Sequence, residues 1–543
     1  MIGIFEKRPV LTIVTLAVLM LGVSFNFLEV SIMEARNFIT AREMIDEGNW
    51  LLTTMNGEPR YQKPPLPTWI TAIFMMVFGM KQVIFIRLPG IIMVSVIGLF
   101  IYFFSKRITG NSRGSLINAL IALTSFYILA IVIEAPWDIY THGFMCLGVF
   151  NIFMLLIKER GYWKHTLLAG LFIGASILSK GPISLYALLL PFLIAFGLSY
   201  RYRLLKVKLF SLFSVLIIAL IIGGWWYLYV RIMDPESFQA MASKETTNWA
   251  NYNVRPFYYY WSFFTQSGIW TIPAFMGLLY PYMKSRVSNL KAYKLTFYWT
   301  IIAVILLSVI PEKKSRYLMP VLIPLALNTG FYVNYMIKTY TSLPSKVEKV
   351  PMQLHFGLIA FICLAFPVGG YFFLKDNAAV NWVFFGFVSI LMVVLGIFLI
   401  RSLIGRRMVD GLYWLVAFVL IAFLFISPMS GYLKSDNYRP ISKLRSELQA
   451  SNQNLYKSEG ISPEMIWQFG DRIPAIDLSD MNRLADNAEF MLLTGVNNEE
   501  SISFLNSRYD IEFIRTYDLN IVSEDSKSYK SRLRNSLYRL RKK

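Results

Sequence analysis

Apolar runs about 20 residues long recur along most of this chain, and they constrain its fold more than any other feature. They extend from Val10 to Ser430. A helix of about 20 apolar residues is long enough to cross the ~30 Å hydrocarbon core of a bilayer. The chain is 56% hydrophobic and 16% charged, which is more apolar and less charged than a soluble domain of this size. The sequence therefore predicts an all-α polytopic membrane protein.

We predict about thirteen transmembrane helices. The run at residues 9–28 is long for a signal peptide and shows no obvious small-residue cleavage site, so we expect it to be a retained first span. The apolar segment 66–80 is short and follows Pro64 and Pro65, so we expect an interfacial helix there. The predicted spans are residues 9–28, 83–105, 114–133, 139–157, 165–180, 183–199, 209–231, 260–283, 295–310, 317–337, 353–374, 381–401 and 409–429.

The distribution of basic residues supports this layout. With the N-terminus inside, every predicted inner loop carries Lys and Arg, as the positive-inside rule requires. Counting 66–80 as a span would put the later clusters outside. The net charge of +20 therefore reflects topology signals and does not indicate nucleic-acid binding. The inner clusters lie at 106–113, 158–164, 201–208, 284–294, 338–349 and 401–407.

Two domains follow from the same layout. Residues 1–430 form a transmembrane domain with long outer loops at 29–82 and 232–259. Residues 431–543 form an outer soluble domain of normal size. Its helical stretch near 441–449 and its strand-like runs at 490–494 and 511–516 predict an α/β or α+β module. The basic end, KSYKSRLRNSLYRLRKK, is expected either to lie on anionic lipid or to be a solvated tail.

Two carboxylates are expected at the outer membrane face. Residues 34–47 predict an amphipathic helix in the interface that ends at Gly48. Glu34 at its start either projects toward the mouth of the bundle or favours the helix dipole. Asp138 lies where one span ends and the next begins, and acids at membrane depth are usually paired or functional. Glu134 is the alternative acid there. A pair of carboxylates suits general-base work or metal binding.

Cations form the complementary set. The outer loop 311–316 carries Lys313, Lys314 and Arg316, against the positive-inside rule. An anionic ligand such as a lipid phosphate explains this exception, and contact with phospholipid headgroups is the alternative. Further candidate substrate-binding residues on the outer side are Arg60, Tyr61, Lys63, Lys180 and Arg255.

Six motifs in order carry a resemblance to a known family. They are MEARNFITAREM followed by EGNW, then RYQKPPL, EAPWDIY, SKGP, RPFYYY and KKSRYLMP. With these motifs the chain resembles the GT-C glycosyltransferases of the aminoarabinose-transferase and protein O-mannosyltransferase type, over roughly residues 9–337. Met33 stands where the family has an acid, so only Glu34 remains of that pair. Asn37 replaces a tyrosine, and Glu245 followed by Thr246 keeps part of another element.

The resemblance implies an inverting transfer of a pentosyl or hexosyl group from a polyprenyl-phosphate donor. The acceptor would be a lipid A-like lipid, another glycan or a protein, at the periplasmic face of a bacterial inner membrane. Asp138 or Glu34 would act as base. The donor phosphate and sugar would contact the cations already named together with Glu245 and Tyr317. A lipid or glycolipid transporter without transfer chemistry is the alternative.

No cofactor is firmly implied by the sequence. Cys146 and Cys363 lie inside apolar runs and have no zinc-like spacing. No P-loop or dinucleotide motif is present, in keeping with a lipid-linked donor that carries its own energy. Two outer carboxylates permit a divalent metal, but the loss of the family acid at Met33 argues against it, and no metal-ligating residue is predicted.

Overall fold

The computed structural model describes residues 2–24, 27–202, 205–458, 460–476, 489–495 and 503–543. The chain forms two compact units. The first comprises residues 1–27, 61–70 and 81–428, and the second comprises residues 28–60, 71–80 and 429–543. Two helices, α4 (Leu66–Phe78) and η6 (Ser427–Leu433), contain residues of both units.

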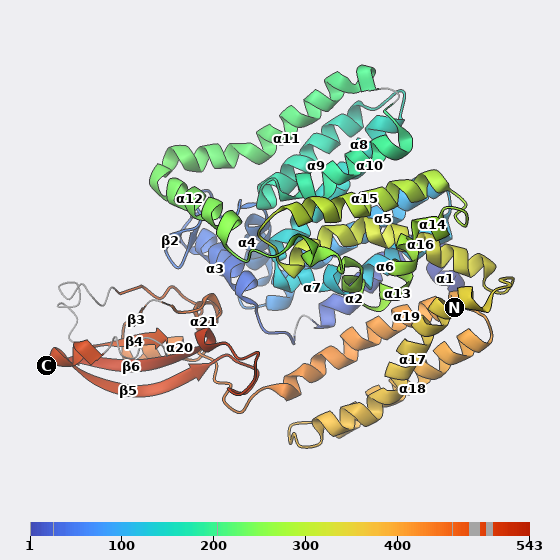
Figure 1. Ribbon diagram of the computed structural model, residues 1–543. Coiled ribbons are helices and arrows are strands. Elements are labelled where there is room, and N and C mark those ends of the chain that lie inside the picture. The colour runs from blue at the N-terminus through green and yellow to red at the C-terminus, as the bar shows by residue number, and fades with distance from the viewer. Residues whose placement is uncertain (1, 25–26, 203–204, 459, 477–488, 496–502) are drawn as a thin grey trace. The chain divides into compact units, whose positions relative to one another are not determined.

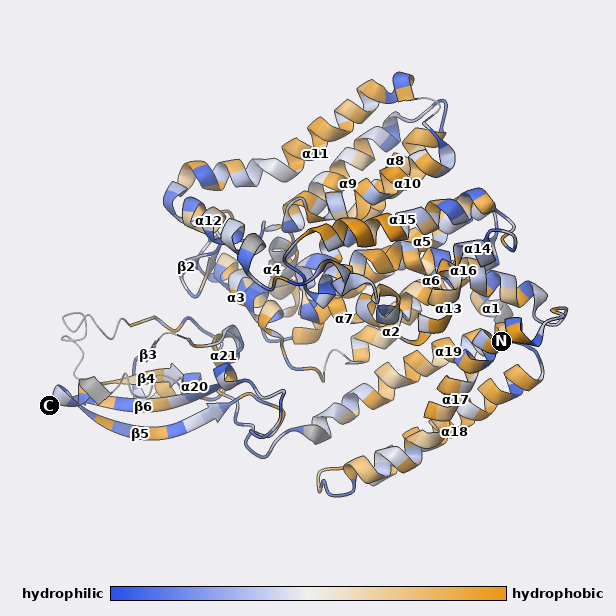
Figure 2. Ribbon diagram, in the orientation of Figure 1, coloured by the Kyte–Doolittle hydropathy of each residue, from blue (hydrophilic) through white to orange (hydrophobic). Residues whose placement is uncertain are grey.

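The first unit is helical (Figure 1). Figure 2 shows that its long helices are mostly hydrophobic along their length, with hydrophilic residues gathered at their ends. Its elements are α1 (Ile2–Lys7), α2 (Pro9–Ser24), α5 (Val83–Thr109), α6 (Ser112–Leu123), α7 (Phe126–Glu134), α8 (Pro136–Ile157), α9 (Trp163–Lys180), η1 (Leu185–Leu189), α10 (Leu190–Tyr200), α11 (Leu205–Met233), α12 (Pro235–Asn251), η2 (Phe257–Tyr260), η3 (Phe263–Trp270), α13 (Thr271–Leu278), α14 (Tyr280–Met283), α15 (Leu290–Val309), η4 (Ser315–Leu318), α16 (Met319–Thr339), α17 (Lys346–Leu374), α18 (Trp382–Ile404), α19 (Met408–Ile421) and η5 (Ala422–Ile426).

By length and composition, seven helices in the described part of the chain can cross a membrane, or eight when the bent pair α6–α7 counts as one span. A multi-pass membrane protein is therefore confirmed, but the count of thirteen spans is not. Several predicted spans are short or interrupted helices. The run 260–283 breaks into η2, η3, α13 and α14, with Gly268 at a φ of 66° inside the break, and the axis bends by 46° between α6 and α7.

Close helix packing fixes the position of α9. This helix packs against both α8 and α11, and it carries Gly170 and Gly174 four residues apart. A Cβ atom at Gly170 would lie 2.6 Å from Ile218, and one at Gly174 would lie 2.7 Å from Ile222. Small residues at this spacing let helix backbones approach closely in membranes. The packing therefore holds the C-terminal end of α9, where Lys180 lies, at a defined place beside α8.

The second unit contains a four-stranded sheet with the order β3-β4-β6-β5. The β3–β4 pair is parallel and the other two pairs are antiparallel. Helix α21 packs against α3, and Phe38 of α3 contacts Trp467 of α21 edge-on. The elements of this unit are α3 (Ile32–Asp46), β1 (Thr54–Met55), β2 (Glu58–Pro59), α20 (Leu444–Ser451), β3 (Leu455–Lys457), α21 (Pro463–Phe469), β4 (Glu489–Gly495), η8 (Ser503–Ser507), β5 (Tyr509–Asp518), η9 (Ser531–Leu533) and β6 (Arg534–Lys542).

The prediction of a basic tail was wrong. Strand β6 occupies the centre of the sheet, between β4 and β5. Leu537 and Leu540 on this strand are fully buried, while Arg539 pairs with Glu489 and Glu512 on the neighbouring strands. Basic side chains on an alternating strand pair with acids across the sheet and do not need lipid.

The predicted helix after the first span is confirmed as α3, and it ends before Gly48, whose φ is +76°. We expected this helix to lie in the membrane interface with one polar face exposed, and that prediction does not agree with its burial. Residues of every face are buried, including Asn37, Arg42 and Glu43. Asn37 donates to the Thr71 hydroxyl at 2.8 Å. The helix is therefore covered by protein on every face.

Candidate functional site

A small cavity of about 100 Å³ lies inside the first unit, beside the start of α8. It collects ionisable and aromatic side chains from α8, α9 and the segment around η4. Its lining residues are Asp138, His142, Lys180, Ile183, Tyr186, Ala187, Tyr260, Leu307, Ile310, Glu312, Tyr317 and Pro320. Polar groups that converge on a cavity in this way are typical of a ligand or reaction site.

An ion pair between Asp138 and Lys180 forms one wall of the cavity. Helix α8 begins at Pro136, a residue suited to a first helical position, so Asp138 lies in the first turn. Lys180 is the last residue of α9, and Gly181 ends that helix with a φ of +80°. An acid at a helix start and a cation at a helix end both suit the helix dipoles. The side chains are 2% and 8% exposed, so the pair is almost dry.

A second group of charged residues lies on the loop before η4. Lys314 Nζ lies 2.5 Å from Glu312 Oε1, and the Tyr317 hydroxyl donates to the same oxygen at 3.2 Å. The ammonium also lies 4.8 Å from the centre of the Tyr252 ring. Tyr317 connects the two groups, because Lys180 Nζ lies 5.3 Å from the centre of its ring. Asp138 and Lys180 thus line one side of the cavity, and Glu312 and Tyr317 line another.

A buried histidine extends the first wall. His142 lies one helical turn after Asp138 on α8, and its Nδ1 lies 2.6 Å from the Ser184 hydroxyl. Both residues are buried. Residues four apart on a helix share a face, which is why both Asp138 and His142 line the cavity.

Lys313, a predicted phosphate ligand, binds backbone in this structure. Its ammonium donates to the carbonyl of Arg255 at 3.0 Å and to that of Ile310 at 2.6 Å. Burial lowers the pKa of Lys313. The Arg255 side chain is exposed, while its backbone N–H donates to the Pro311 carbonyl at 3.2 Å. These contacts hold the loop that carries Glu312.

Arg316 lies on η4 beside Tyr317, with its guanidinium carbon 5.9 Å from the ring centre. Its Nε is buried, and no hydrogen-bond partner for that atom occurs in the described part of the chain. A buried donor without a partner is costly. Arg316 therefore has a buried donor left to offer a ligand.

Tyr61 is buried and bonds to the residue that follows α11. Its hydroxyl donates to Asp234 Oδ2 at 2.8 Å, and this hydrogen bond holds the pKa of Asp234 below its usual value. Lys63 is half-buried in the segment before α4, and Glu245 is half-buried on α12. Tyr61, Lys63 and Glu245 are not among the residues that line the cavity at Asp138 and Lys180.

Glu34 and Arg60 belong to the second unit. Glu34 completes a capping box at the start of α3, where its carboxylate accepts from the Ser31 N–H at 3.0 Å. Arg60 is buried and donates to the Thr40 hydroxyl at 3.1 Å and to the Arg36 carbonyl at 3.3 Å. Burial, with a smaller contribution from Arg36, lowers the pKa of Arg60 to about 9. Both residues therefore have structural partners within their own unit.

Glu312 and His142 are among the cavity residues that sequence reasoning missed. Glu312 lies in the loop 311–316, which we predicted as a site because of its cations. The acidic side chain in the same loop could have indicated a second carboxylate at the site. His142 is four residues after Asp138, so helical spacing could have found it. Among the described residues, no group of three or more His, Cys, Asp or Glu side chains could hold a metal ion.

Comparisons with known proteins agree with the fold. Residues 62–227 match the family described as dolichyl-phosphate-mannose-protein mannosyltransferase. An uncharacterised protein of Aquifex aeolicus is 24% identical over 309 residues, which cover 54% of this chain and 58% of that protein. The undecaprenyl phosphate-alpha-4-amino-4-deoxy-L-arabinose arabinosyl transferase of Serratia proteamaculans is 22% identical over 337 residues, covering 61% and 59%. The chain thus spans less than two thirds of the length of these two relatives.

A solved structure extends the likeness to nearly the whole chain. The crystal structure of ArnT from Cupriavidus metallidurans bound to undecaprenyl phosphate has a TM-score of 0.67 at 14% identity, and covers 98% of this chain and 97% of that one. The fold is therefore that of the GT-C glycosyltransferases, and the resemblance inferred from the motifs is confirmed. In particular, the chain has the fold of ArnT, and its own C-terminal part carries a small four-stranded sheet.

Proposed function

We propose that this protein transfers a sugar from a polyprenyl-phosphate carrier to an acceptor in the bacterial envelope. The observation that carries the proposal is the nearly dry Asp138–Lys180 pair in a cavity that also holds Glu312 and Tyr317. The names of the relatives point to the same donor class, and the fold of an ArnT that binds undecaprenyl phosphate supports it.

The reaction needs a base for the acceptor and a cation for the leaving group. The acceptor hydroxyl oxygen attacks the anomeric carbon, and the bond from that carbon to the phosphate oxygen breaks. The electron pair of this bond leaves with the polyprenyl phosphate, and the hydroxyl proton passes to a carboxylate. We assign the carboxylate to Asp138 and the stabilisation of the departing phosphate to Lys180. Attack opposite the leaving group inverts the anomeric centre.

The ion pair couples the activation of Asp138 as a base to the binding of the donor phosphate by Lys180. In the free protein each charge neutralises the other, which offsets the cost of burying both. A donor phosphate that binds Lys180 replaces Asp138 as the partner of the ammonium. The carboxylate is then free to accept a proton from the acceptor. Arg316, with its unpartnered buried Nε, supplies a second cation for the phosphate.

We place the site at the periplasmic face of the bacterial inner membrane. The inner loops with basic clusters lie at the opposite ends of the helices from Asp138 and from the loop 311–316, and the positive-inside rule assigns those clusters to the cytoplasm. The donor tail would then lie in the outer half of the bilayer.

The test is genetic replacement followed by lipid analysis. We would delete the gene, restore it as wild type, as Asp138→Asn or as Asp376→Asn, and profile polyprenyl-phosphate sugars by mass spectrometry. Asp376 is an exposed acid on the connection between α17 and α18, so it serves as a matched control. The proposal expects one lipid-linked sugar to accumulate in the deletion and in Asp138→Asn, and to be cleared by wild type and Asp376→Asn.

The other outcomes separate the alternatives. If Asp138→Asn at normal abundance clears the lipid as wild type does, Asp138 is not the base. If no lipid-linked sugar changes even in the deletion, the donor class is wrong and a transporter becomes the better hypothesis.

A further inference from the structure

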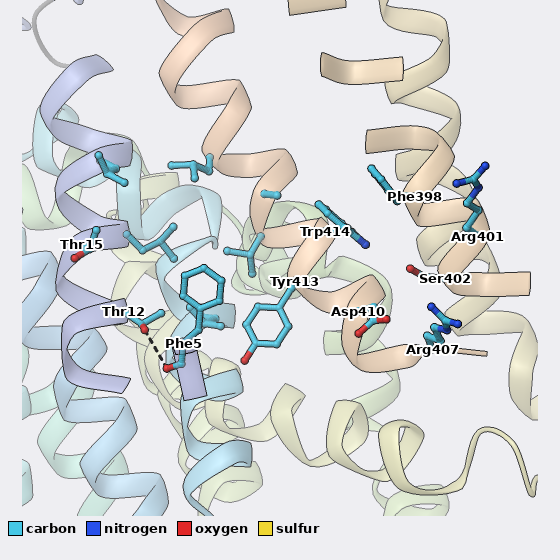
Figure 3. Close-up of a pocket in the computed structure, with 16 residues that line it drawn as sticks. Phe5, Thr12, Thr15, Phe398, Arg401, Ser402, Arg407, Asp410, Tyr413 and Trp414 are labelled. Carbon is cyan, nitrogen blue, oxygen red and sulfur yellow. Dashed lines mark hydrogen bonds between the residues drawn. The ribbon is translucent and has the colours of Figure 1, made fainter. Parts of the chain in front are cut away.

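A second, larger cavity of about 900 Å³ lies in the first unit and shares no lining residue with the cavity at Asp138 and Lys180. Figure 3 shows the residues that line it. One face of α19 forms its floor, and α2 and α18 form its two walls. The residues that α19 contributes lie on one face of the helix, from Asp410 to Leu420. Thr12, Leu16 and Leu19 likewise share one face of α2. The cavity is therefore a groove along the helices.

The groove is as long as one leaflet of a bilayer. Asp410 and Leu420 are ten residues apart on helix, which corresponds to about 15 Å along the axis. This is half of the ~30 Å hydrocarbon core. Its far end, at Leu19 and Leu420, is apolar.

The walls of the groove present mainly apolar groups to its interior, because the polar group of Thr12 is used within the protein. The Thr12 hydroxyl donates to the backbone carbonyls of Phe5 at 3.0 Å and Arg8 at 3.1 Å, so it has no need of a ligand. Phe398 of α18 stacks on Trp414 of α19 with the ring centres 4.6 Å apart. These groups offer contact to hydrocarbon chains.

Positive charge gathers at the other end. Arg401 lies in the last turn of α18, and Arg407 is the residue before α19 (Figure 3). Both are exposed. No side-chain hydrogen bond caps the start of α19, so its N–H groups add to the positive field there. Asp410 also lines this end, while the nearby Glu6 is paired with Arg113 at 2.7 Å.

We propose that this groove binds one anionic diacyl phospholipid of the inner leaflet. Its phosphate would lie between Arg401 and Arg407, and its acyl chains would fill the groove beside α19. The positive-inside rule assigns these arginines to the cytoplasmic face, where anionic lipids are concentrated. A diacyl lipid matches the one-leaflet length, whereas a polyprenyl chain is much longer. The proposal does not depend on the transferase activity.

The experiment measures binding of phosphatidylglycerol to the purified, delipidated full chain by native mass spectrometry. The test variants are the double substitution Arg401→Gln/Arg407→Gln and the groove-filling Ala417→Trp. The matched control is Arg107→Gln/Arg160→Gln, which removes two exposed arginines of other inner loops. An exposed arginine near an anionic lipid surface contributes roughly fivefold in affinity. We therefore expect the double variant to bind about 25-fold more weakly and the control to bind as wild type does.

Each further outcome decides the proposal. Phosphatidylglycerol should raise the thermal midpoint of wild type and leave that of the double variant unchanged. The thermal transition of the double variant without lipid also verifies that this variant is folded. If the double variant and the control bind phosphatidylglycerol equally well, the bound lipid is ordinary boundary lipid and the proposal is overturned. Equal affinity for phosphatidylcholine, or displacement of phosphatidylglycerol by an equal amount of polyprenyl phosphate, would also overturn the proposal. Because both arginines are exposed, their removal is expected to leave the fold intact.

Discussion

Two buried carboxylates, one in each unit, serve different purposes. Glu43 of the second unit is 2% exposed and accepts hydrogen bonds from the Thr54 hydroxyl at 2.6 Å and from the backbone of Asn56 and Gly57 at 2.5 Å and 3.2 Å. Asp138 of the first unit is equally buried, but its charge is balanced by the Lys180 side chain, and it lines a cavity. The two acids therefore differ in what stabilises the carboxylate: a hydroxyl and backbone N–H groups at Glu43, and a charged side chain at Asp138.

A carboxylate bound by a fixed backbone turn cannot change partners without local unfolding. A carboxylate paired with a side chain can exchange that partner for a ligand. Burial and charge are alike at Glu43 and Asp138, so neither property alone identifies a reactive acid. The five predictions below break or sharpen this comparison, from the largest expected effect to the smallest.

Replacement of Asp138 by Asn should have the largest effect on function. We expect the transfer rate to fall by about 10²- to 10⁴-fold, the usual contribution of a general base. The variant should also lose stability, about 3–5 kcal/mol, because Lys180 is left buried without its partner. Turnover of a lipid-linked donor and thermal unfolding in detergent measure the two effects.

The double variant Asp138→Asn/Lys180→Met separates structure from chemistry. Removal of both charges should restore most of the lost stability and leave the rate as low as in the single variant. Recovery of activity together with stability would show that the pair is only structural.

Replacement of Glu43 by Gln should affect stability and leave the chemistry intact. Hydrogen bonds to a charged acceptor contribute about 1.5–3 kcal/mol each, and Gln keeps one acceptor oxygen. We expect a loss of about 2–4 kcal/mol, measured by thermal unfolding, with the rate per folded molecule within about threefold of wild type. A rate loss as large as that of Asp138→Asn at full folding would remove the contrast between the two acids.

The turn that Glu43 holds should be sensitive to backbone conformation. Asn56 and Gly57 have φ values of 57° and 81°, as a tight hairpin turn requires. The Asn56 amide also exchanges two hydrogen bonds with the backbone of Ile473, at 2.8 Å and 2.9 Å. Asn56→Ala should cost about 2–3 kcal/mol from the lost bonds and strain. Asn56→Gly keeps the φ and should cost about 1 kcal/mol less in thermal unfolding, and equal losses would show that conformation does not matter there.

The smallest effect is a pH dependence at Tyr61 and Asp234. The hydrogen bond from Tyr61 lowers the pKa of Asp234 in the folded protein. A lowered folded pKa means that the contribution to stability is complete above the unfolded pKa of about 3.9 and is lost as the pH falls through the folded pKa. Tyr61→Phe should therefore lower the thermal midpoint slightly at pH 6, with the difference from wild type shrinking toward pH 3. A constant difference across that range would assign the effect to packing against Trp226.

The sequence by itself determined the class of the protein. The apolar runs indicated membrane helices, because a helix of about 20 apolar residues crosses the bilayer with all its backbone groups hydrogen-bonded internally. A local signal also determined the end of α3 before Gly48, since that end depends on the conformational preference of a single residue. The ordered motifs identified the GT-C resemblance.

Only the tertiary structure decided which charged residues share a site. It paired Asp138 with Lys180, which lie 42 positions apart in the chain, and it placed Glu312 on the same cavity. It also used Glu34 for a helix cap and Lys313 for backbone carbonyls. It turned the basic end of the chain into the central strand β6. The physical reason is common to these cases: the partner of a charge is set by packing between distant segments, and local sequence carries no record of that packing.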